Sequence, residues 1–185
     1  MATRTLLAAA LAAAAFSPIV GAQAQSLTGS QVTAASYCCM TPTEPDRVTN
    51  SVTATVGPGV EFPQGSFTSL VGAPMTAPVT IDVGSSTIQL TYSAGGTTGP
   101  GGFNGFAFTF SGAPTITGVS LDPSSTYNPV LTFNANTVFV NEAGLTLTPT
   151  STAIVNITAV PEPQSYALMV GGLALLGVMA RRRKG

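Results

Sequence analysis

Histidine and tryptophan are absent from the 185 residues, and the only lysine is Lys184. Without histidine, the Ser-His-Asp and Cys-His systems that activate a nucleophile are excluded. A Ser-Lys pair is excluded from the central part of the chain, because that part has no lysine. No Gly-rich segment precedes a Lys-Ser or Lys-Thr pair, so a phosphate-binding loop is absent too. We therefore expect that the protein is not an enzyme.

Charged side chains are scarce, at 7% of the sequence. Between residues 25 and 160 the only base is Arg47, against six acids, which gives a formal net charge of −5. A surface with so little positive charge cannot neutralise phosphates, so we exclude nucleic acid as a partner. The six acids are Glu44, Asp46, Glu61, Asp82, Asp122 and Glu142. Two of them across a cleft would suit a carbohydrate-active enzyme, but no spacing in the sequence brings two together.

Calcium is the metal that the acidic residues would suit, since it prefers carboxylate and carbonyl oxygens. The candidate ligands lie in expected loops and turns: Glu61, Asp82, Asp122, Asn141 and Glu142. No Asp-x-Asp-x-Asp cluster accompanies them, so we expect no metal and no cofactor. Exposed tyrosines, Tyr92 and Tyr127, would suit stacking on sugar rings, as in a sugar-binding module.

The two cysteines, Cys38 and Cys39, are adjacent. In an exported protein they meet an oxidising compartment, where thiols pair. A bridge between neighbours closes a strained ring. A disulfide within the pair, intermolecular bridges and two free thiols all remain open. A closed zinc site needs four ligands, which two thiolates without histidine do not supply unless carboxylates complete it.

The first 24 residues are typical of a secretory signal peptide. Arg4 supplies the positive start, residues 6–16 are apolar, and Ala22-Gln23-Ala24 is a small-x-small cleavage site that leaves Gln25 as the first mature residue. The alternative is a retained membrane anchor, for which the apolar segment is short.

The C-terminal part combines three features. Pro161-Glu162-Pro163 favours an extended conformation, because proline fixes its own φ angle and disfavours the α conformation in the residue before it. Residues 166–180 carry no charge, and we expect a transmembrane helix over 165–180, near the shortest that crosses a ~30 Å hydrocarbon core. The cations that follow indicate a cytoplasmic stop-transfer segment; they are Arg181, Arg182, Arg183 and Lys184. A buried core helix and a plain, uncut membrane anchor are the alternatives.

This order of motif, apolar segment and basic cluster resembles the PEP-CTERM sorting signal of exopolysaccharide-producing Gram-negative bacteria, over about residues 160–185. The resemblance implies that the partner is an exosortase, an integral-membrane cysteine protease or transpeptidase that cuts in or beside the motif. Pro161, Glu162 and Pro163 would then be a recognition site and not catalytic groups. It also implies a precursor held transiently in the inner membrane, followed by a structural or adhesive role at the cell surface or in the exopolysaccharide matrix of a biofilm.

Between the two targeting segments, short β-branched and aromatic runs alternate with turns, which predicts strands and no amphipathic helix. The clearest hairpin joins residues 79–83 to 88–92, and Phe106, Phe108 and Phe110 form an apolar stripe expected in the core. Further strands are expected at 48–56, 115–121, 130–133, 137–140, 145–147 and 154–158, and the glycine-rich segment 95–102 is expected to be a loop. This spacing predicts an antiparallel β-sandwich, with jelly-roll and immunoglobulin-like topologies both open.

The expected organisation is therefore a signal peptide at 1–24 and a flexible entry segment at 25–47. An all-β sandwich follows at 48–159, and a sorting signal at 160–185. Little regular structure is expected between Gln25 and Pro45, because this stretch is rich in Ser, Thr and Gln and then interrupted by proline.

Overall fold

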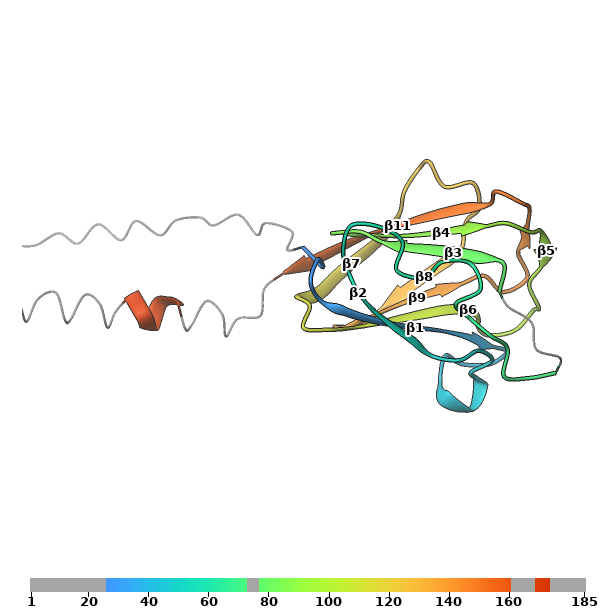
Figure 1. Cartoon of the computed structure of the whole chain (residues 1–185), viewed down its shortest axis with the longest axis horizontal. Coiled ribbons are helices and arrows are strands. Elements are labelled where there is room, and N and C mark those ends of the chain that lie inside the picture. The colour runs from blue at the N-terminus through green and yellow to red at the C-terminus, as the bar shows by residue number, and fades with distance from the viewer. Residues whose placement is uncertain (1–25, 73–76, 161–168, 174–185) are drawn as a thin grey trace, which may run out of the picture.

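The computed structural model describes residues 26–72, 77–160 and 169–173, and its strands lie mainly in two antiparallel sheets that face each other (Figure 1). The predicted all-β class is confirmed at this level. The predicted signal peptide, Pro161 to Pro163 and Arg181 to Lys184 lie outside the described residues.

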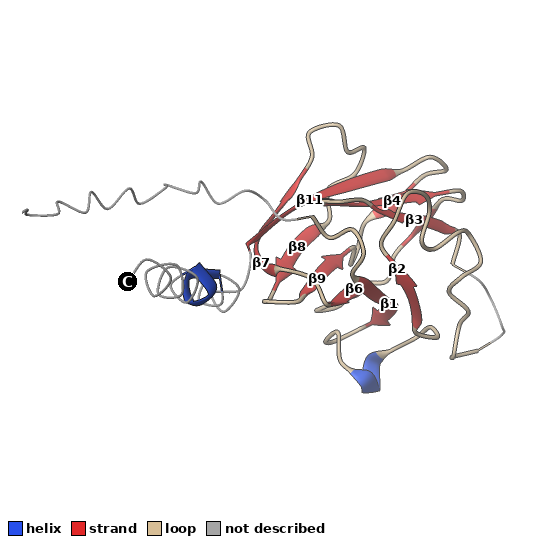
Figure 2. Ribbon diagram, turned by 60° about the vertical axis from the view of Figure 1, so that its left-hand side comes forward, coloured by secondary structure: helices blue, strands red, loops and turns tan. Residues whose placement is uncertain are grey.

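The larger sheet has five strands in the order β2-β1-β6-β9-β8. They are β2 (Val52–Thr55), β1 (Gln31–Cys38), β6 (Asn104–Ser111), β9 (Thr137–Asn141) and β8 (Val130–Phe133). The segment between β1 and β2 contains a short 3₁₀ helix, η1 (Glu44–Asp46), which lies beside the end of β1 in Figure 2.

The second sheet has four strands in the order β3-β4-β11-β7, and a small third sheet pairs β10 with β5. The strands are β3 (Val79–Val83), β4 (Thr87–Tyr92), β11 (Thr152–Val160), β7 (Thr115–Leu121), β10 (Thr146–Leu147) and β5 (Gly96–Thr97). The predicted hairpin of β3 and β4 is confirmed, with Val83 opposite Ile88.

Alternate apolar side chains from both sheets fill one core. Phe106, Phe108 and Phe110 of β6 are at most 3% exposed, so the prediction that this stripe is core is confirmed. Burying each ring contributes roughly 1.5–3 kcal/mol. The facing sheet contributes Ile81, Leu90 and Val155, among others. Phe67, from the segment before β3, packs edge-on against Phe106 with ring centroids 5.1 Å apart.

The outward faces of both sheets carry mainly threonine, serine, asparagine and glutamine. Thr33 of β1 lies opposite Thr53 of β2, and their hydroxyl oxygens are 2.8 Å apart. Thr80, Thr91 and Thr152 form a similar row across β3, β4 and β11. Hydroxyl side chains therefore cover strand positions where charged residues are more usual.

The prediction that residues 25–45 have little regular structure is wrong, because residues 31–38 form β1. This strand lies inside the five-stranded sheet and pairs along its whole length with β6. Val32 and Ala34 are fully buried and alternate with outward residues. Because these two residues are small and polar residues stand between them, the sequence shows no clear strand pattern here. Pairing with a neighbouring strand on each side stabilises the strand.

Smaller corrections concern strand limits. Gly96 and Thr97 form β5 inside the segment expected to be only a loop, paired with β10. The expected strand at 48–56 is reduced to β2 at its C-terminal part. In contrast, β11 runs two residues further in each direction than the expected 154–158.

Residues 169–173 form a short helical stretch within the predicted membrane span 165–180. Among the residues that the structure describes, no helix is long and apolar enough to cross a membrane.

Candidate functional site

The chain leaves the β-structure directly into the predicted sorting motif. β11 is an interior strand, paired with β4 through residues 152–156 and with β7 through residues 155–160. Its last residue, Val160, lies opposite Thr115, and Ala159 is 1% exposed. Pro161 follows Val160 with no intervening spacer. The predicted recognition residues therefore begin one peptide bond beyond a strand that is paired with β7 up to its last residue.

The most buried carboxylate of the described residues, Glu142, lies just after β9. It is 2% exposed, and Arg47, the cation among the residues that the structure describes, does not contact it. Tyr92 of β4 donates its hydroxyl to one carboxylate oxygen at 2.6 Å, and Tyr127, from the β7–β8 connection, donates to the other at 2.6 Å. The two tyrosine rings meet edge to face, with centroids 6.0 Å apart. This cluster, Glu142 with Tyr92 and Tyr127, links the two main sheets at the end far from Val160.

Burial dominates the electrostatics of the cluster. It raises the pKa of Glu142 to about 7, against the opposing effect of the hydrogen bonds from Tyr127 and Tyr92. Burial, followed by the charge of Glu142, raises the pKa of both Tyr92 and Tyr127, so both hydroxyls stay protonated and can donate. With both carboxylate oxygens occupied and almost no exposed surface, Glu142 has no open side for a substrate. The arrangement suits a structural contact between sheets.

An open hollow of about 450 Å³ lies beside Tyr127, lined also by Asp122 and Asn128. A second hollow of about 180 Å³ is lined by Tyr92, Gly95 and Leu147. Neither of these hollows is lined by a pair of carboxylates. Of the two tyrosines expected to stack on sugars, Tyr92 is 7% exposed and belongs to the core, whereas Tyr127 is half-buried at the edge of the larger hollow.

The five calcium candidates are spread over the fold and have protein partners. In the described residues, no group of three or more Asp, Glu, Cys or His side chains could hold a metal. Asp122 accepts hydrogen bonds from Ser124, from both its backbone nitrogen and its hydroxyl. Asn141 accepts from the backbone nitrogens of Asn104 and Ala143.

The remaining two candidates, Glu61 and Asp82, are neighbours. The carboxylate of Glu61 accepts hydrogen bonds from the backbone nitrogens of Gly57 and Val83, at 2.8 and 2.7 Å. Partial burial, followed by the charge and hydrogen bonding of Glu61, raises the pKa of Asp82. The two acids, which the sequence did not associate, therefore lie close together. The hydrogen bonds from Gly57 and Val83 to Glu61 hold the segment before β3 against that strand.

Cys38 and Cys39 form a disulfide with each other, which is one of the three alternatives that the sequence left open. The turn that contains it packs against the glycine-rich segment before β6. The backbone nitrogen of Cys39 donates to the carbonyl of Phe103, and that of Gly102 donates to the carbonyl of Cys39. A Cβ atom on Gly101 would lie 2.2 Å from the Cys39 oxygen, so only glycine fits this close approach.

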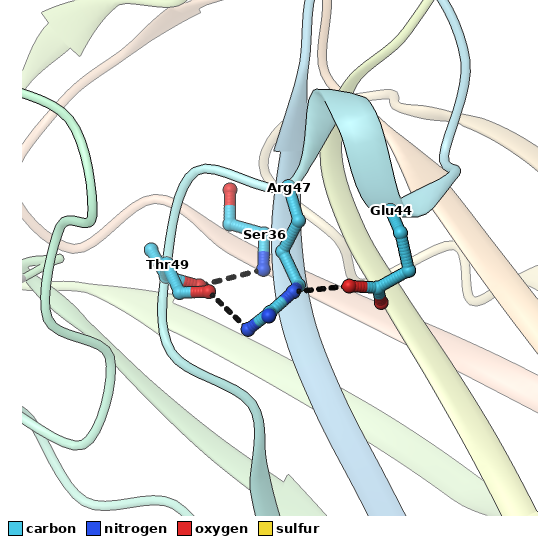
Figure 3. Close-up of polar contacts among 4 residues, drawn as sticks. All are labelled: Ser36, Glu44, Arg47 and Thr49. Atoms are coloured by element: carbon cyan, nitrogen blue, oxygen red, sulfur yellow. Dashed lines mark hydrogen bonds and ion pairs between the residues drawn. The ribbon is translucent and has the colours of Figure 1, made fainter.

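Arg47 is the one cation among residues 26–72, 77–160 and 169–173, and local contacts hold it (Figure 3). Its Nε donates to Glu44 at 3.0 Å and its Nη1 to the carbonyl of Thr49 at 3.1 Å. The Thr49 hydroxyl in turn accepts from the backbone nitrogen of Ser36. These bonds attach the η1 segment to β1. Because Glu44 is largely exposed, the ion pair itself contributes little stability.

Sequence reasoning missed the Glu142 cluster. It assigned Glu142 to a turn because Asn, Glu, Ala and Gly follow one another there, and Tyr92 lies 50 residues away. The sequence contains one usable signal. A buried tyrosine hydroxyl needs a hydrogen-bond partner, and only six acids between residues 25 and 160 could serve as one.

Among known proteins, a scan of families matches residues 159–184 to the PEP-CTERM protein-sorting motif. No curated protein and no solved structure matches the chain. The match begins inside β11, at the buried Ala159, and covers the Pro-Glu-Pro residues, the apolar segment and the basic cluster. The chain therefore carries, over residues 159–184, the PEP-CTERM protein-sorting motif that marks substrates of an exosortase.

Proposed function

We propose that this protein is exported, held in the inner membrane by its C-terminal segment, cut by an exosortase, and then retained at the cell surface or in the exopolysaccharide matrix. There it serves as a structural or adhesive β-sandwich without enzymatic activity. The observation that carries the proposal is the sorting motif, joined without a spacer to a folded β-domain.

Two features of the domain support a passive role. The acids lack the arrangement that hydrolysis of a sugar bond needs, which is two carboxylates across an open cleft. Glu142 is buried against two tyrosines, and Glu61 is occupied by two backbone nitrogens. The outward faces carry hydroxyl and amide groups with little charge, which suits hydrogen bonding to a hydrated polysaccharide.

A sugar-binding role is the second candidate, and the hollow beside Tyr127 favours it. The partly exposed ring of Tyr127, next to Asp122 and Asn128, offers both stacking and polar contacts. Calorimetric titration with the polysaccharide of the native host would test it. Binding that Asn128→Ala weakens, with Asn50→Ala as a control outside the hollow, would support this role.

Intact-mass spectrometry of the protein from its native host tests the sorting function. The wild type should begin at Gln25 and end between Pro161 and Gln164 in the extracellular fraction. Glu162→Ala should keep the C-terminal residues up to Gly185 and stay in the cell envelope, whereas Gln164→Ala, beside the motif, should be processed. A wild-type species that keeps Arg181 to Lys184 in every fraction would show that the segment is only an anchor.

A further inference from the structure

Both described ends of the β-domain leave it on the same side. In Figure 1 the start of the described chain, before β1, and the end of β11 lie at one end of the domain, and β5 lies at the other. We call the first of these the exit end. It consists of residues 26–30, 84–86, 111–115, 134–136 and 158–160.

Backbone hydrogen bonds hold these segments together across the two sheets. Leu27 donates to the carbonyl of Ser85 at 2.7 Å, and Ile116 donates to the carbonyl of Ala135 at 2.8 Å. The side chain of Asn134 accepts from the backbone nitrogens of Asn136 and Thr137, which fixes the turn between β8 and β9. The exit end is thus an ordered surface and not a set of independent loops.

No residue of the exit end is charged. Four strands begin there, β1, β4, β7 and β9. Three of them are followed at the far end by charged residues: β1 by η1 and Arg47, β7 by Asp122, and β9 by Glu142. Asp82 lies two residues before Gly84 of the exit end. Glu61 lies near it in space, because its carboxylate accepts hydrogen bonds from the backbone nitrogens of Gly57 and Val83. These two acids lie at the β3 edge of the four-stranded sheet, two strands away from β11, so the part of the exit end around Val160 and β7 carries no charge.

The sorting motif leaves little room between this surface and an enzyme that holds it. At 3.3–3.6 Å per residue, the α-carbon of Glu162 lies at most about 7 Å from that of Val160. Peeling β11 away to gain length would break its pairing with Thr115 and Ile116 and would expose Ala159. An enzyme that grips Pro161 to Pro163 on the intact domain must therefore touch the exit end.

We propose that the exit end is the surface on which the exosortase docks when it reads the motif. The inference rests on the proposed sorting function and adds a second recognition element, which belongs to the folded domain. The lack of charge on the exit end suits this contact. An acid there would lose its hydration against a close partner surface, and an anionic membrane would repel it.

The test places three acids on the exit end of the full-length precursor in its native host. Thr28, Ser85 and Ala135 are exposed there, and the structure gives their side chains no hydrogen bond. The triple variant Thr28→Glu, Ser85→Glu, Ala135→Glu should be processed roughly tenfold more slowly than wild type in a pulse-chase measurement. The matched control carries three acids at the opposite end, at exposed positions: Met40→Glu, Ala94→Glu and Pro100→Glu. It should be processed at the wild-type rate.

Two further variants make the result specific. A Gly-Ser spacer of about ten residues between Val160 and Pro161 should restore processing of the acidic variant, because the enzyme then no longer meets the domain. The same three positions changed to lysine should also be slow. If the lysine variant were processed as fast as wild type, the slow processing of the acidic variant would be due to repulsion by anionic lipid. That result would overturn docking on the enzyme.

Equal processing of wild type, exit-end variant and control would overturn the docking proposal and leave the sorting function intact. A wild type that is never cut would overturn both. Thermal unfolding of each purified precursor in detergent checks the fold, and an exit-end variant whose defect persists with the spacer present would also overturn the proposal.

Discussion

The hydroxyl of Tyr92 and the carboxylate of Glu142, 50 residues apart in the sequence, meet at 2.6 Å and join the four-stranded sheet to the end of β9 in the five-stranded sheet. Tyr127 completes the contact from the connection between β7 and β8. Among the described residues this is the one place where a fully buried acid bridges the two layers. The stability of the domain should depend on its protonation.

We expect the free energy of unfolding to rise as the pH falls from 8 to 5. The pKa of Glu142 is about 7 in the folded protein, against about 4.5 for a glutamate exposed to water. The stabilisation from its proton is therefore complete below about pH 4.5 and is lost as the pH rises through 7. The full effect is about 3 kcal/mol, at 1.36 kcal/mol per pKa unit. Urea unfolding at several pH values measures it.

Glu142→Gln provides the control for this pH dependence, because a neutral side chain of the same shape removes the titration. The difference in unfolding free energy between pH 5 and pH 8 should largely vanish in the variant. Asp122, whose pKa is lowered mainly by its hydrogen bonds from Ser124, acts with the opposite sign and only at more acidic pH. A variant with the same pH profile as wild type would assign the dependence to other groups.

Tyr92→Phe should destabilise the domain by roughly 2–3 kcal/mol at pH 8, where Glu142 is mostly ionised. The substitution leaves one oxygen of a buried carboxylate without its donor. The loss should shrink at pH 5, because the protonated acid needs fewer donors. Tyr37→Phe, outside the cluster, is the control and should show no such pH-dependent difference. A loss that is equal at both pH values would mean that packing, and not the hydrogen bond, dominates.

The period-2 patterns predicted the hairpin of β3 and β4 and the core stripe of β6 because side chains in a strand alternate between core and solvent. They failed for β1, whose inward residues include Ala34 and whose outward residues are polar. That strand is stabilised by its two neighbours in the sheet, which are distant in sequence. The local sequence of β1 is therefore not enough to predict that it forms a strand.

The sorting motif could be predicted from sequence because its parts are contiguous, whereas the exit end and the Glu142 cluster could not. Thr28, Ser85 and Ala135 come from three different turns, and only the strand order brings them beside Val160. The burial of Glu142 likewise depends on how the two sheets face each other. Sites made by topology need the fold before they can be recognised.

Gly105→Ala should be among the most destabilising small substitutions in the chain. A Cβ atom there would lie 2.0 Å from the Val140 oxygen and 3.2 Å from the Glu142 nitrogen, so β6 and β9 would have to separate. We expect a loss of about 3 kcal/mol or more, measured by thermal or urea unfolding. Gly96→Ala is the matched control, since its Cβ would meet nothing within 4 Å. Similar unfolding midpoints for the two variants would contradict this close approach of the strands.

The mature protein should contain an internal disulfide between Cys38 and Cys39. Its intact mass should lack the two thiol hydrogens, alkylation should require prior reduction, and a non-reducing gel should show a monomer. The turn also has backbone bonds from Cys39 to Phe103 and from Gly102 to Cys39. The double variant Cys38→Ser, Cys39→Ser should therefore keep the β-sheet far-ultraviolet spectrum, while proteolysis near Met40 becomes faster as the turn loosens. Alkylation of the untreated protein, or a reducible dimer, would instead support the free-thiol or intermolecular alternative.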